Sequence, residues 1–326
     1  ILKPQTADAT LDVHSVKVYQ VKNLNSIPLT DEEKKNVLTT AMGTWIDGMM
    51  EATDGYVTSW DVVNEALSGA DKDGDGKFDL QSAKRGNVSA DDAKNNFYWQ
   101  DYLGNEDYVR IVVAAARKYY AENGGTAPLK LFINDYNLES DWDDNKKAKS
   151  LVHWIKKWEA DGVTQIDGIG TQMHVTLNCS DDAEKNAASI AELKAKVDAM
   201  FQTMAATGKL VRVTELDLSL GTGTPSSNQY KAQSDAYRMI VESYKANVPE
   251  AQQSGITIWS LSDNEAEHEY WLKGQVPNLF DKDYKRKWAY KGFCDGIAGE
   301  DLGLKYGGEE YKAFYEKNNV SSTVDK

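Results

Sequence analysis

The sequence predicts an α/β fold with a parallel sheet, and two observations support this. Short apolar segments of strand length alternate along the chain with amphipathic segments of helical length. This alternation is typical of parallel strands joined by right-handed crossovers. The length of 326 residues is ordinary for one α/β barrel but long for most other single domains. No glycine-rich phosphate loop opens a predicted helix, so a dinucleotide-binding fold has no support.

The N-terminal segment differs from the rest of the chain. Residues 9–21 alternate apolar and polar side chains as a strand does, and we interpret them as the closing strand of a β-sandwich. A proline-containing link follows over residues 23–35, where Thr30 is placed to cap a helix with Glu33 as its capping-box partner. That helix is predicted over residues 34–52.

Strands and helices then alternate regularly. The predicted strands cover residues 56–63, 129–134, 166–173, 209–216 and 255–262. The main helices between them cover residues 105–123, 145–162, 189–208 and 227–247. An eight-stranded barrel that lacks three strands exposes two raw sheet edges, which is physically poor. The sheet is therefore either open, or this chain is the rear part of a barrel whose front lies elsewhere.

Composition excludes several classes of partner. The chain is 41% hydrophobic and 27% charged, as expected of a globular protein, and its formal net charge is −14. An acidic surface repels nucleic acid and anionic membranes, and no apolar run is long enough to span a bilayer. Cys179 and Cys294 are too few for a disulfide scaffold or a zinc set, and leave one bridge or two free thiols open. The chain starts at Ile1 without a signal peptide, which suggests a processed or excised piece.

Polar side chains stand at the C-terminal end of every predicted strand. They are Asn64, Glu65, Asn134, Asp135, Tyr136, Asn137, Gln172, His174, Glu215, Asp217, Ser262, Asp263 and Asn264. One such strand end would be explained by caps or turn residues. Five consecutive strand ends with two glutamates, an imidazole and several amides favour a ligand site, because ligands bind at this rim in α/β sheets and barrels.

Two of these residues, Glu65 and Glu215, indicate the chemistry. Paired carboxylates at one site are the equipment for glycosidic cleavage, with one acid to protonate the leaving oxygen and one ionised nucleophile or base. His174 is a plausible tuner, because an imidazole beside Glu215 keeps that carboxylate ionised, and Asp217 can fix the tautomer of the imidazole. No G-x-S-x-G elbow appears, so a serine triad has no support.

Five ordered motifs carry a resemblance to a known family. They are WDVVNEA (60–66), LFINDYN (131–137), IDGIGTQMH (166–174), VRVTELD (211–217) and TIWSLSDNEAEHEYW (257–271). In this order they resemble the strand-end motifs of glycoside hydrolase family 10, the retaining endo-β-1,4-xylanases on a TIM (β/α)8 barrel. Residues 278–293 resemble the family's closing segment.

The resemblance implies roles for single residues. Glu65, at the end of the fourth barrel strand, looks like the general acid/base, and Glu215, at the end of the seventh, looks like the nucleophile. The implied substrate-binding residues are Asn64 for the sugar 2-hydroxyl, Gln172 and His174 beside the nucleophile, Trp259 and Trp271 as subsite walls, and Tyr136 on the leaving-group side. Asp217 would support His174.

The resemblance also implies an incomplete barrel. Family members carry three further strands at the front, and none of these is in this chain. We expect residues 1–22 to be the end of a carbohydrate-binding module inserted into the barrel, and residues 23–326 to be the C-terminal part of the barrel, supplying about strands 4–8. The front strands would come from another segment or a separate chain. The family also implies a secreted, periplasmic or cell-surface location.

A second motif follows Glu65. Residues 71–82 match the spacing of a calcium loop at Asp71, Asp73, Asp75, Gly76 and Asp79, but Ser82 replaces the bidentate glutamate of the twelfth position. The alternative is a polar, glycine-rich loop insertion beside the site. No cofactor is expected to be required, and calcium is a possible ligand of this loop only.

The sequence as a whole predicts a retaining endo-β-1,4-xylanase that acts on xylan or xylo-oligosaccharides. Retention would place the two carboxyl groups about 5–5.5 Å apart. Two alternatives remain open at this point. One is another β-1,4-glycanase active on glucan, and the other is a glycan-binding barrel without catalysis.

Overall fold

The computed structural model describes residues 28–84, 88–140, 142–267 and 269–303, together with residues 15 and 17. Apart from those two residues, the predicted sandwich strand and the predicted module end at 1–22 lie outside the described residues. The division at residue 22 therefore stays a prediction.

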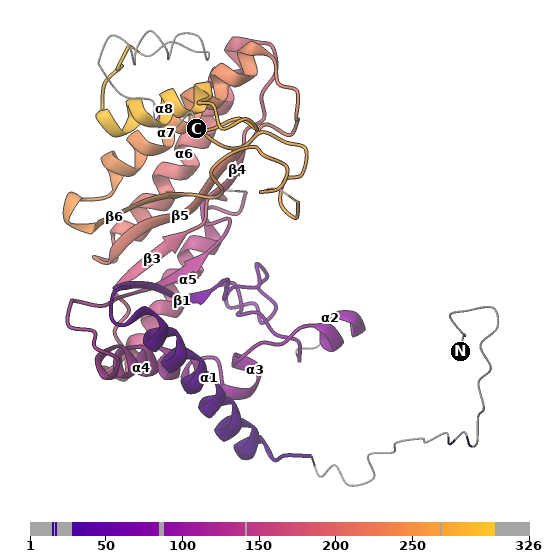
Figure 1. Cartoon of the computed structure of the whole chain (residues 1–326), viewed down its shortest axis with the longest axis vertical. Helices are drawn as coiled ribbons and strands as arrows, with labels where there is room; N and C mark the ends of the chain where they lie inside the picture. The colour runs from indigo at the N-terminus through magenta and orange to yellow at the C-terminus, as the bar shows by residue number, and fades with distance from the viewer. Residues whose placement is uncertain are drawn as a thin grey trace, which may run out of the picture.

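One parallel sheet forms the centre of the described chain (Figure 1). Its strands are β1 (Ser59–Asn64), β2 (Lys130–Asp135), β3 (Gly168–Thr171), β4 (His174–Thr176), β5 (Leu210–Ser219) and β6 (Gln253–Ile258). The order is β1-β2-β3-β5-β6, and β4 pairs with β5 further along the same edge as β3. All pairings are parallel, which confirms the predicted α/β class.

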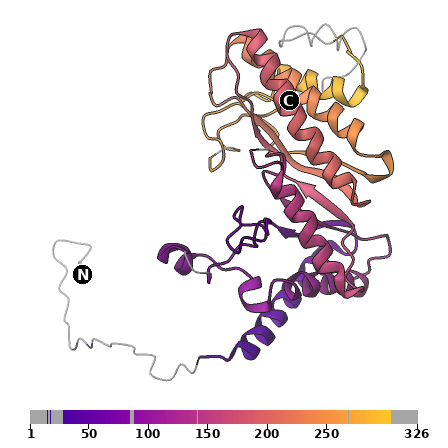
Figure 2. The same ribbon diagram turned by 180° about the vertical axis from the view of Figure 1, so that it is seen from behind.

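Helices cover one face of this sheet. The long helices are α1 (Asp31–Thr53), α4 (Asp107–Glu122), α5 (Lys146–Trp158), α6 (Ala183–Ala205), α7 (Ser227–Asn247) and α8 (Trp288–Ala298). Short helical segments are α2 (Ala90–Asn95), α3 (Gln100–Leu103), η1 (Glu159–Asp161) and η2 (Glu250–Gln252). Seen from behind, α5, α6 and α7 lie side by side over the strands (Figure 2). Their apolar faces bury Trp158, Phe201 and Tyr237 against the sheet.

Helix α1 begins as its sequence predicts. The Thr30 hydroxyl accepts from the Glu33 backbone N–H, and the Glu33 carboxylate accepts from the Thr30 backbone N–H, so the capping box is formed. The apolar stripe of α1 packs against α4 and buries Met42, Ile46 and Met50. Ser226 and Gln229 form a second capping box at the start of α7.

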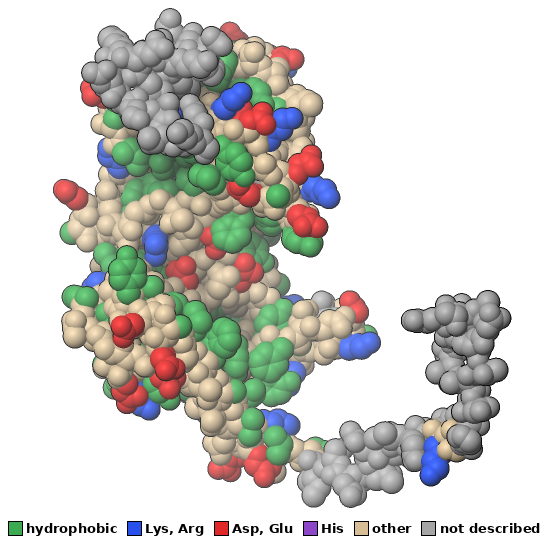
Figure 3. Space-filling model, in the orientation of Figure 1, with side chains coloured by type: hydrophobic (Ala, Val, Ile, Leu, Met, Phe, Trp, Pro, Cys, Tyr) green, Lys and Arg blue, Asp and Glu red, His purple; other side chains and the backbone are tan. Residues whose placement is uncertain are grey.

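The sheet has two edges within the described residues. No described strand pairs with the outer side of β1 or of β6, and no pairing joins these two strands. Beside β1 lies a groove of about 690 Å³ between that strand and α1, with Met49 and Trp60 in its wall and Trp45 72% exposed. The face in Figure 3 is hollowed between the part that holds α6–α8 and the part that holds α1 and α4.

Several element boundaries depart from the predictions, and helix α6 begins six residues before its predicted start at 189. The strand predicted over 166–173 is interrupted after Thr171, because Met173 adopts a left-handed φ of 60° that breaks the ladder before β4. Strand β6 ends at Ile258, four residues before the predicted end at 262, and Ser260 beyond it has a φ of 65°. Helix α8 lies in the closing segment, for which the sequence predicted no helix.

Two further predictions concern the described residues as a whole. Cys179 and Cys294 are both free thiols, so the open question of a bridge is decided for this structure. Among the described helices, none is long and apolar enough to cross a membrane.

Candidate active site

Four of the strand ends turn through left-handed backbone. Glu65 follows β1 with φ 56°, Asn137 follows β2 with φ 53°, Met173 follows β3 and Ser260 follows β6. A non-glycine residue in this conformation costs roughly 1–2 kcal/mol. Such strain persists where the surroundings over-determine the backbone, and it clusters at functional sites. The surrounding structure therefore holds the backbone at the rim of the sheet in strained conformations.

A cavity of about 630 Å³ opens at this rim and gathers the predicted site. All nine predicted active-site residues line it, namely Asn64, Glu65, Tyr136, Gln172, His174, Glu215, Asp217, Trp259 and Trp271. They come from β1, β4 and β5 and from the segments that follow β1, β2, β3 and β6. Residues more than 200 positions apart in the chain thus share one cavity.

Glu215 on β5 is held at both carboxylate oxygens. The Asn134 amide donates to its Oε1 at 3.0 Å, and His174 Nε2 lies 3.2 Å from its Oε2. The other ring nitrogen of His174, Nδ1, lies 3.0 Å from Oδ2 of buried Asp217. The Trp271 indole N–H donates to the same Asp217 oxygen at 2.7 Å. This chain of contacts fixes the orientation of both the imidazole and the Glu215 carboxylate.

His174 is charged at neutral pH. Burial by itself lowers the pKa of this imidazole, but hydrogen bonds to the carboxylates of Asp217 and Glu215 outweigh that effect and raise the pKa to about 9, from an ordinary 6.5. At pH 7 both ring nitrogens therefore carry protons, and both donate to a carboxylate. The sequence predicts both this contact with Glu215 and this supporting position of Asp217.

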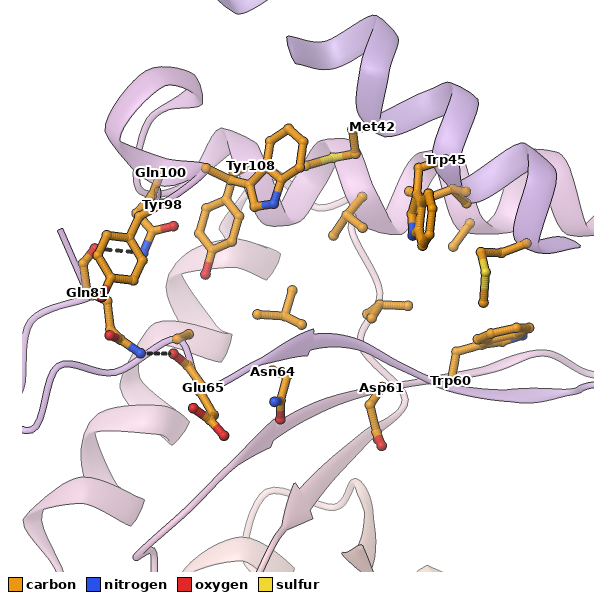
Figure 4. A pocket seen from close by; sticks show the side chains of 18 of the residues that line it. Met42, Trp45, Trp60, Asp61, Asn64, Glu65, Gln81, Tyr98, Gln100 and Tyr108 are labelled. Atoms are coloured by element: carbon orange, nitrogen blue, oxygen red, sulfur yellow. Dashed lines mark hydrogen bonds between the residues drawn. The ribbon is translucent and has the colours of Figure 1, made fainter. Parts of the chain in front are cut away.

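Glu65 on the β1 side is held differently. The Gln172 amide donates to its Oε1 at 2.8 Å, and no cation of the described residues forms an ion pair with this carboxylate. The Gln81 amide donates to the Glu65 backbone carbonyl at 2.6 Å, and Gln100 in turn donates to the Gln81 carbonyl (Figure 4). Figure 4 shows Glu65 at the end of β1, beside the groove that carries Trp45 and Trp60.

The family is decided at this point by comparison with known proteins. The model of glycosyl hydrolase family 10 matches residues 16–296. The chain belongs to this family. Its sequence is 28% identical over 274 residues to endo-1,4-β-xylanase A of Cellvibrio japonicus, and 30% identical over 281 residues to endo-1,4-β-xylanase A of Halalkalibacterium halodurans. These alignments cover 78% and 79% of the chain but only 39% and 58% of the two relatives, so the chain spans only part of the length of each.

Solved family 10 structures share the fold. A family 10 protein of Paenibacillus barcinonensis superposes with a TM-score of 0.61 at 26% identity, over 84% of this chain and 70% of the other. Xylanase 10C of Cellvibrio japonicus, solved as a variant in complex with xylopentaose, gives a TM-score of 0.60 at 27% identity, over 86% and 52% of the two chains. The parallel sheet of this chain thus matches family 10 TIM-barrel structures over most of its length.

Aromatic side chains border the cavity of this family 10 chain. Trp259 and Trp271 flank His174, with ring centroids 5.9 Å and 4.6 Å from the imidazole, and about two-fifths of each indole residue is exposed. On the opposite side, the Lys147 ammonium lies 3.3 Å from the centre of the Tyr136 ring and pairs with buried Asp135 at 2.8 Å. Flat rings held in place in this way suit the faces of sugar rings.

Sequence reasoning missed three residues that organise the site. Gln81 lies in the loop insertion after β1, and no motif marked it. Thr214 donates its hydroxyl to the Asn134 amide oxygen at 2.7 Å, but it reads as an ordinary strand residue. Asn134 was noticed only as one polar residue among many at the rim. Its position two residues before Tyr136, which places both side chains on the same side of the extended chain, is the signal that could have singled it out.

The aspartate loop is organised largely by the chain itself. The ligand oxygens of Asp71, Asp73 and Asp75 lie within 4.8 Å of one another. Asp71 accepts from the backbone N–H groups of Gly74 and Gly76 and pairs with the Lys146 ammonium at 2.7 Å. The hydrogen bond from Lys146 lowers the pKa of Asp71. Asp79 is buried and accepts from the Lys72 backbone N–H instead, so the calcium spacing does not gather all four aspartates.

Proposed function

We propose that this chain is the catalytic portion of a retaining endo-β-1,4-xylanase. The observation that carries the proposal is the unequal setting of two carboxylates in one cavity. Glu215 is gripped at both oxygens by an amide and an imidazolium, whereas Glu65 receives one neutral amide. The fixed, multiply hydrogen-bonded carboxylate suits a nucleophile, and the carboxyl group without a cationic partner suits a proton donor.

In the first step of the proposed reaction, the Glu215 carboxylate attacks the anomeric carbon of the sugar. The bond from that carbon to the bridging oxygen breaks as Glu65 gives its proton to this oxygen. A covalent glycosyl-enzyme ester at Glu215 results. Asn64 would hold the 2-hydroxyl of the reacting ring, with Trp259 and Trp271 packed against its faces.

In the second step, water replaces the departed sugar. Glu65, now ionised, takes a proton from this water as its oxygen attacks the anomeric carbon. The ester bond to Glu215 breaks, and the sugar is released with the configuration of the original bond. The imidazolium of His174 stays beside the Glu215 carboxylate in both steps and needs no proton exchange.

Azide rescue of glutamate variants tests these roles. We expect Glu65→Ala to lower turnover of xylan by about 10²–10⁴-fold. Azide should restore activity on an aryl xyloside and give a β-glycosyl azide. Glu215→Ala should lose more, and its azide product should be the α-anomer. The matched control is Glu122→Ala on α4, which should leave turnover unchanged. Turnover in Glu65→Ala equal to that of the unaltered protein would show that Glu65 is not the proton donor and would sink the proposal.

The choice of xylan rests on the relatives. Most of those compared are named endo-1,4-β-xylanases, and three solved complexes hold xylopentaose or xylotriose. One relative at 28% identity, from Acetivibrio thermocellus, is named exoglucanase XynX, which keeps a glucan-active enzyme as the second candidate. Release of reducing ends from beechwood xylan and from barley β-glucan separates the two. We expect xylan to be preferred, and equal or greater release from glucan would reverse the assignment.

We further propose that the β1 edge pairs with additional barrel strands, supplied by another segment or a separate chain. The support is the unpaired edge of β1 and the apolar groove beside it. This chain would then supply about strands 4–8, and residues 1–22 would end an inserted module. The chain alone should bind the dye anilinonaphthalene sulfonate, and Met49→Lys in the groove should weaken that binding. A chain that binds no dye has a covered groove, which would refute this proposal.

Two smaller proposals concern the surroundings of the enzyme. Because polymeric xylan does not cross a membrane, we propose that the protein acts outside the cytoplasm. Detection of the protein only in the cytoplasmic fraction would refute this.

Family 10 glycosidases generally need no cofactor, and calcium would bind only at Asp71, Asp73 and Asp75. Calorimetric titration with calcium, repeated on Asp73→Ala, tests that site, and the absence of heat in both proteins would end the idea.

A further inference from the structure

Asn134 lies behind the cavity wall and is 1% exposed. Its Nδ2 group donates to Glu215 Oε1 at 3.0 Å and to Asn64 Oδ1 at 2.9 Å. Its Oδ1 accepts the Thr214 hydroxyl at 2.7 Å. Asn134 therefore touches the proposed nucleophile and a proposed substrate-binding residue without lining the cavity.

The orientation of the Asn134 amide follows from the ionised Glu215 carboxylate. An ionised carboxylate only accepts hydrogen bonds, so the Asn134 atom that faces Glu215 is its NH2 group. The Gln172 NH2 group likewise donates to Glu65 Oε1 at 2.8 Å, and this oxygen can accept while the acid proton of Glu65 sits on the other oxygen. Both NH2 groups also face Asn64, at 2.9 Å and 3.2 Å, so the Asn64 atom between them is its oxygen.

One continuous path thus joins the two carboxylates. It runs from Glu215 through Asn134, Asn64 and Gln172 to Glu65. Because the Asn64 oxygen is occupied by two donors, its NH2 group points away from them. A turned Asn134 amide would present its oxygen to the Glu215 carboxylate and release the Asn64 oxygen. Thr214 opposes that turn, because its hydroxyl has the amide oxygen as its acceptor.

Gly170 on the neighbouring strand β3 leaves room for the Asn134 side chain. Asn64 pairs in register with Asn134, and Asn134 pairs in register with Gly170 on β3. A Cβ atom on Gly170 would lie 2.6 Å from the Asn134 amide oxygen and 3.0 Å from the Thr214 methyl group. Glycine at 170 therefore allows the buried amide to sit against β3 beside Thr214.

We infer that Asn134, oriented by the Thr214 hydroxyl, is a positioning residue that aligns Glu215 for attack and sets the direction in which Asn64 presents its NH2 group. This inference rests on the proposed function, in which Glu215 is the nucleophile. A carboxylate held at Oε1 by Asn134 and at Oε2 by His174 has one rotational position. Misplacement of a reacting group by about 1 Å costs on the order of 100-fold in rate.

The test compares Thr214→Val with Thr214→Ser in the full-length protein, on 4-nitrophenyl β-xylobioside. This substrate has a good leaving group, so its first step depends on the nucleophile more than on the acid. Valine keeps the shape of the buried side chain and removes the hydroxyl, whereas serine keeps the hydroxyl and removes a methyl group. We expect Thr214→Val to lower kcat roughly 10-fold or more with KM little changed, and Thr214→Ser to stay close to the unaltered protein.

A merely structural role would change the stability of the two variants and leave their kcat equal at a temperature where both are folded, since valine orphans a buried acceptor and serine leaves a cavity. Equal kcat in both variants, or a lower kcat in the serine variant, would overturn the inference. Asn134→Asp, which places a second carboxyl group against Glu215, should lose more than Thr214→Val, and full activity in it would also overturn the inference. An unaltered protein that turns over no xyloside, or a fully active Glu215→Ala, would overturn the proposed function itself.

Discussion

The β5 side and the β1 side of the cavity differ in how far the described chain encloses them. Around β5, Val211, Val213 and Leu216 are fully buried, and helices α6 and α7 pack over the strand. Around β1, Asp61 is exposed and the strand borders the apolar groove in which Trp45 stands (Figure 4). Glu215 belongs to the first region, and Glu65 belongs to the second.

This difference teaches how the two carboxylates are controlled. The position of Glu215 is fixed by groups of this chain alone, through Asn134, His174 and Asp217. The position of Glu65 depends on a strained backbone at the sheet edge, and on two glutamines that reach it from other segments. Whatever covers the groove beside β1 will affect Glu65 more than Glu215.

The largest expected effect is on the β5 side and depends on pH. Because the folded-state pKa of His174 is about 9, above its ordinary 6.5, its stabilisation is complete below about pH 6.5 and is lost as pH rises through about 9. The shift corresponds to an upper value of about 3 kcal/mol. Urea unfolding of the unaltered protein between pH 6 and pH 9.5 should show this decline. In His174→Gln the decline should be much weaker, and an equal decline in both proteins would contradict this account.

Activity should respond to the same residue. His174→Gln removes the charged donor from Glu215 Oε2, and loss of one such preorganised donor costs about 10²–10³-fold in kcat. The matched control is His153→Gln on α5, distant from the cavity, which should retain its kcat. Steady-state kinetics on a xylo-oligosaccharide measure both variants. A kcat of His174→Gln within about twofold of that of the unaltered enzyme would show that turnover does not depend on the contact between His174 and Glu215.

The β1 side should respond to its partner strands. In protein that carries the strands proposed to cover the groove, Trp45→Lys should lower the free energy of unfolding by about 1–3 kcal/mol, because a charge would then be buried without a partner. Val163→Lys is the matched control, since Val163 is 87% exposed on a loop and its replacement should stay within about 0.5 kcal/mol. Equal values for the two variants would mean that the groove stays open.

The smallest expected effects come from the two capping boxes. Ser226→Ala on α7 should lower the free energy of unfolding by about 1 kcal/mol, because α7 is packed between α6 and α8 and unfolds with the whole molecule. Thr30→Ala on α1 should instead increase hydrogen exchange in the first turn, with a smaller change in global stability. A larger global effect at Thr30 would show that α1 is as firmly integrated as α7.

The sequence predicted most of this arrangement because two signals are local. Alternating apolar strands and amphipathic helices located the five main strands, and the polar residues at their ends located the cavity. The break at Met173 was not predictable, because a left-handed residue other than glycine leaves no mark in the sequence. Helix α8 was also not predicted. Gln81 and Thr214 were missed for a related reason, since their importance lies in partners brought near by the fold.

The left-handed residues at the rim have a consequence for laboratory evolution. Glycine adopts this backbone conformation without steric cost, so selection for heat resistance alone should favour glycine at Asn137 and Ser260, whose side chains are not buried in the core. Selection for turnover should oppose it wherever the bend aims a side chain into the cavity. At Glu65 the conflict is complete, because the residue under strain is itself the proposed acid. Populations selected under the two regimes should therefore diverge first at Glu65, Asn137 and Ser260.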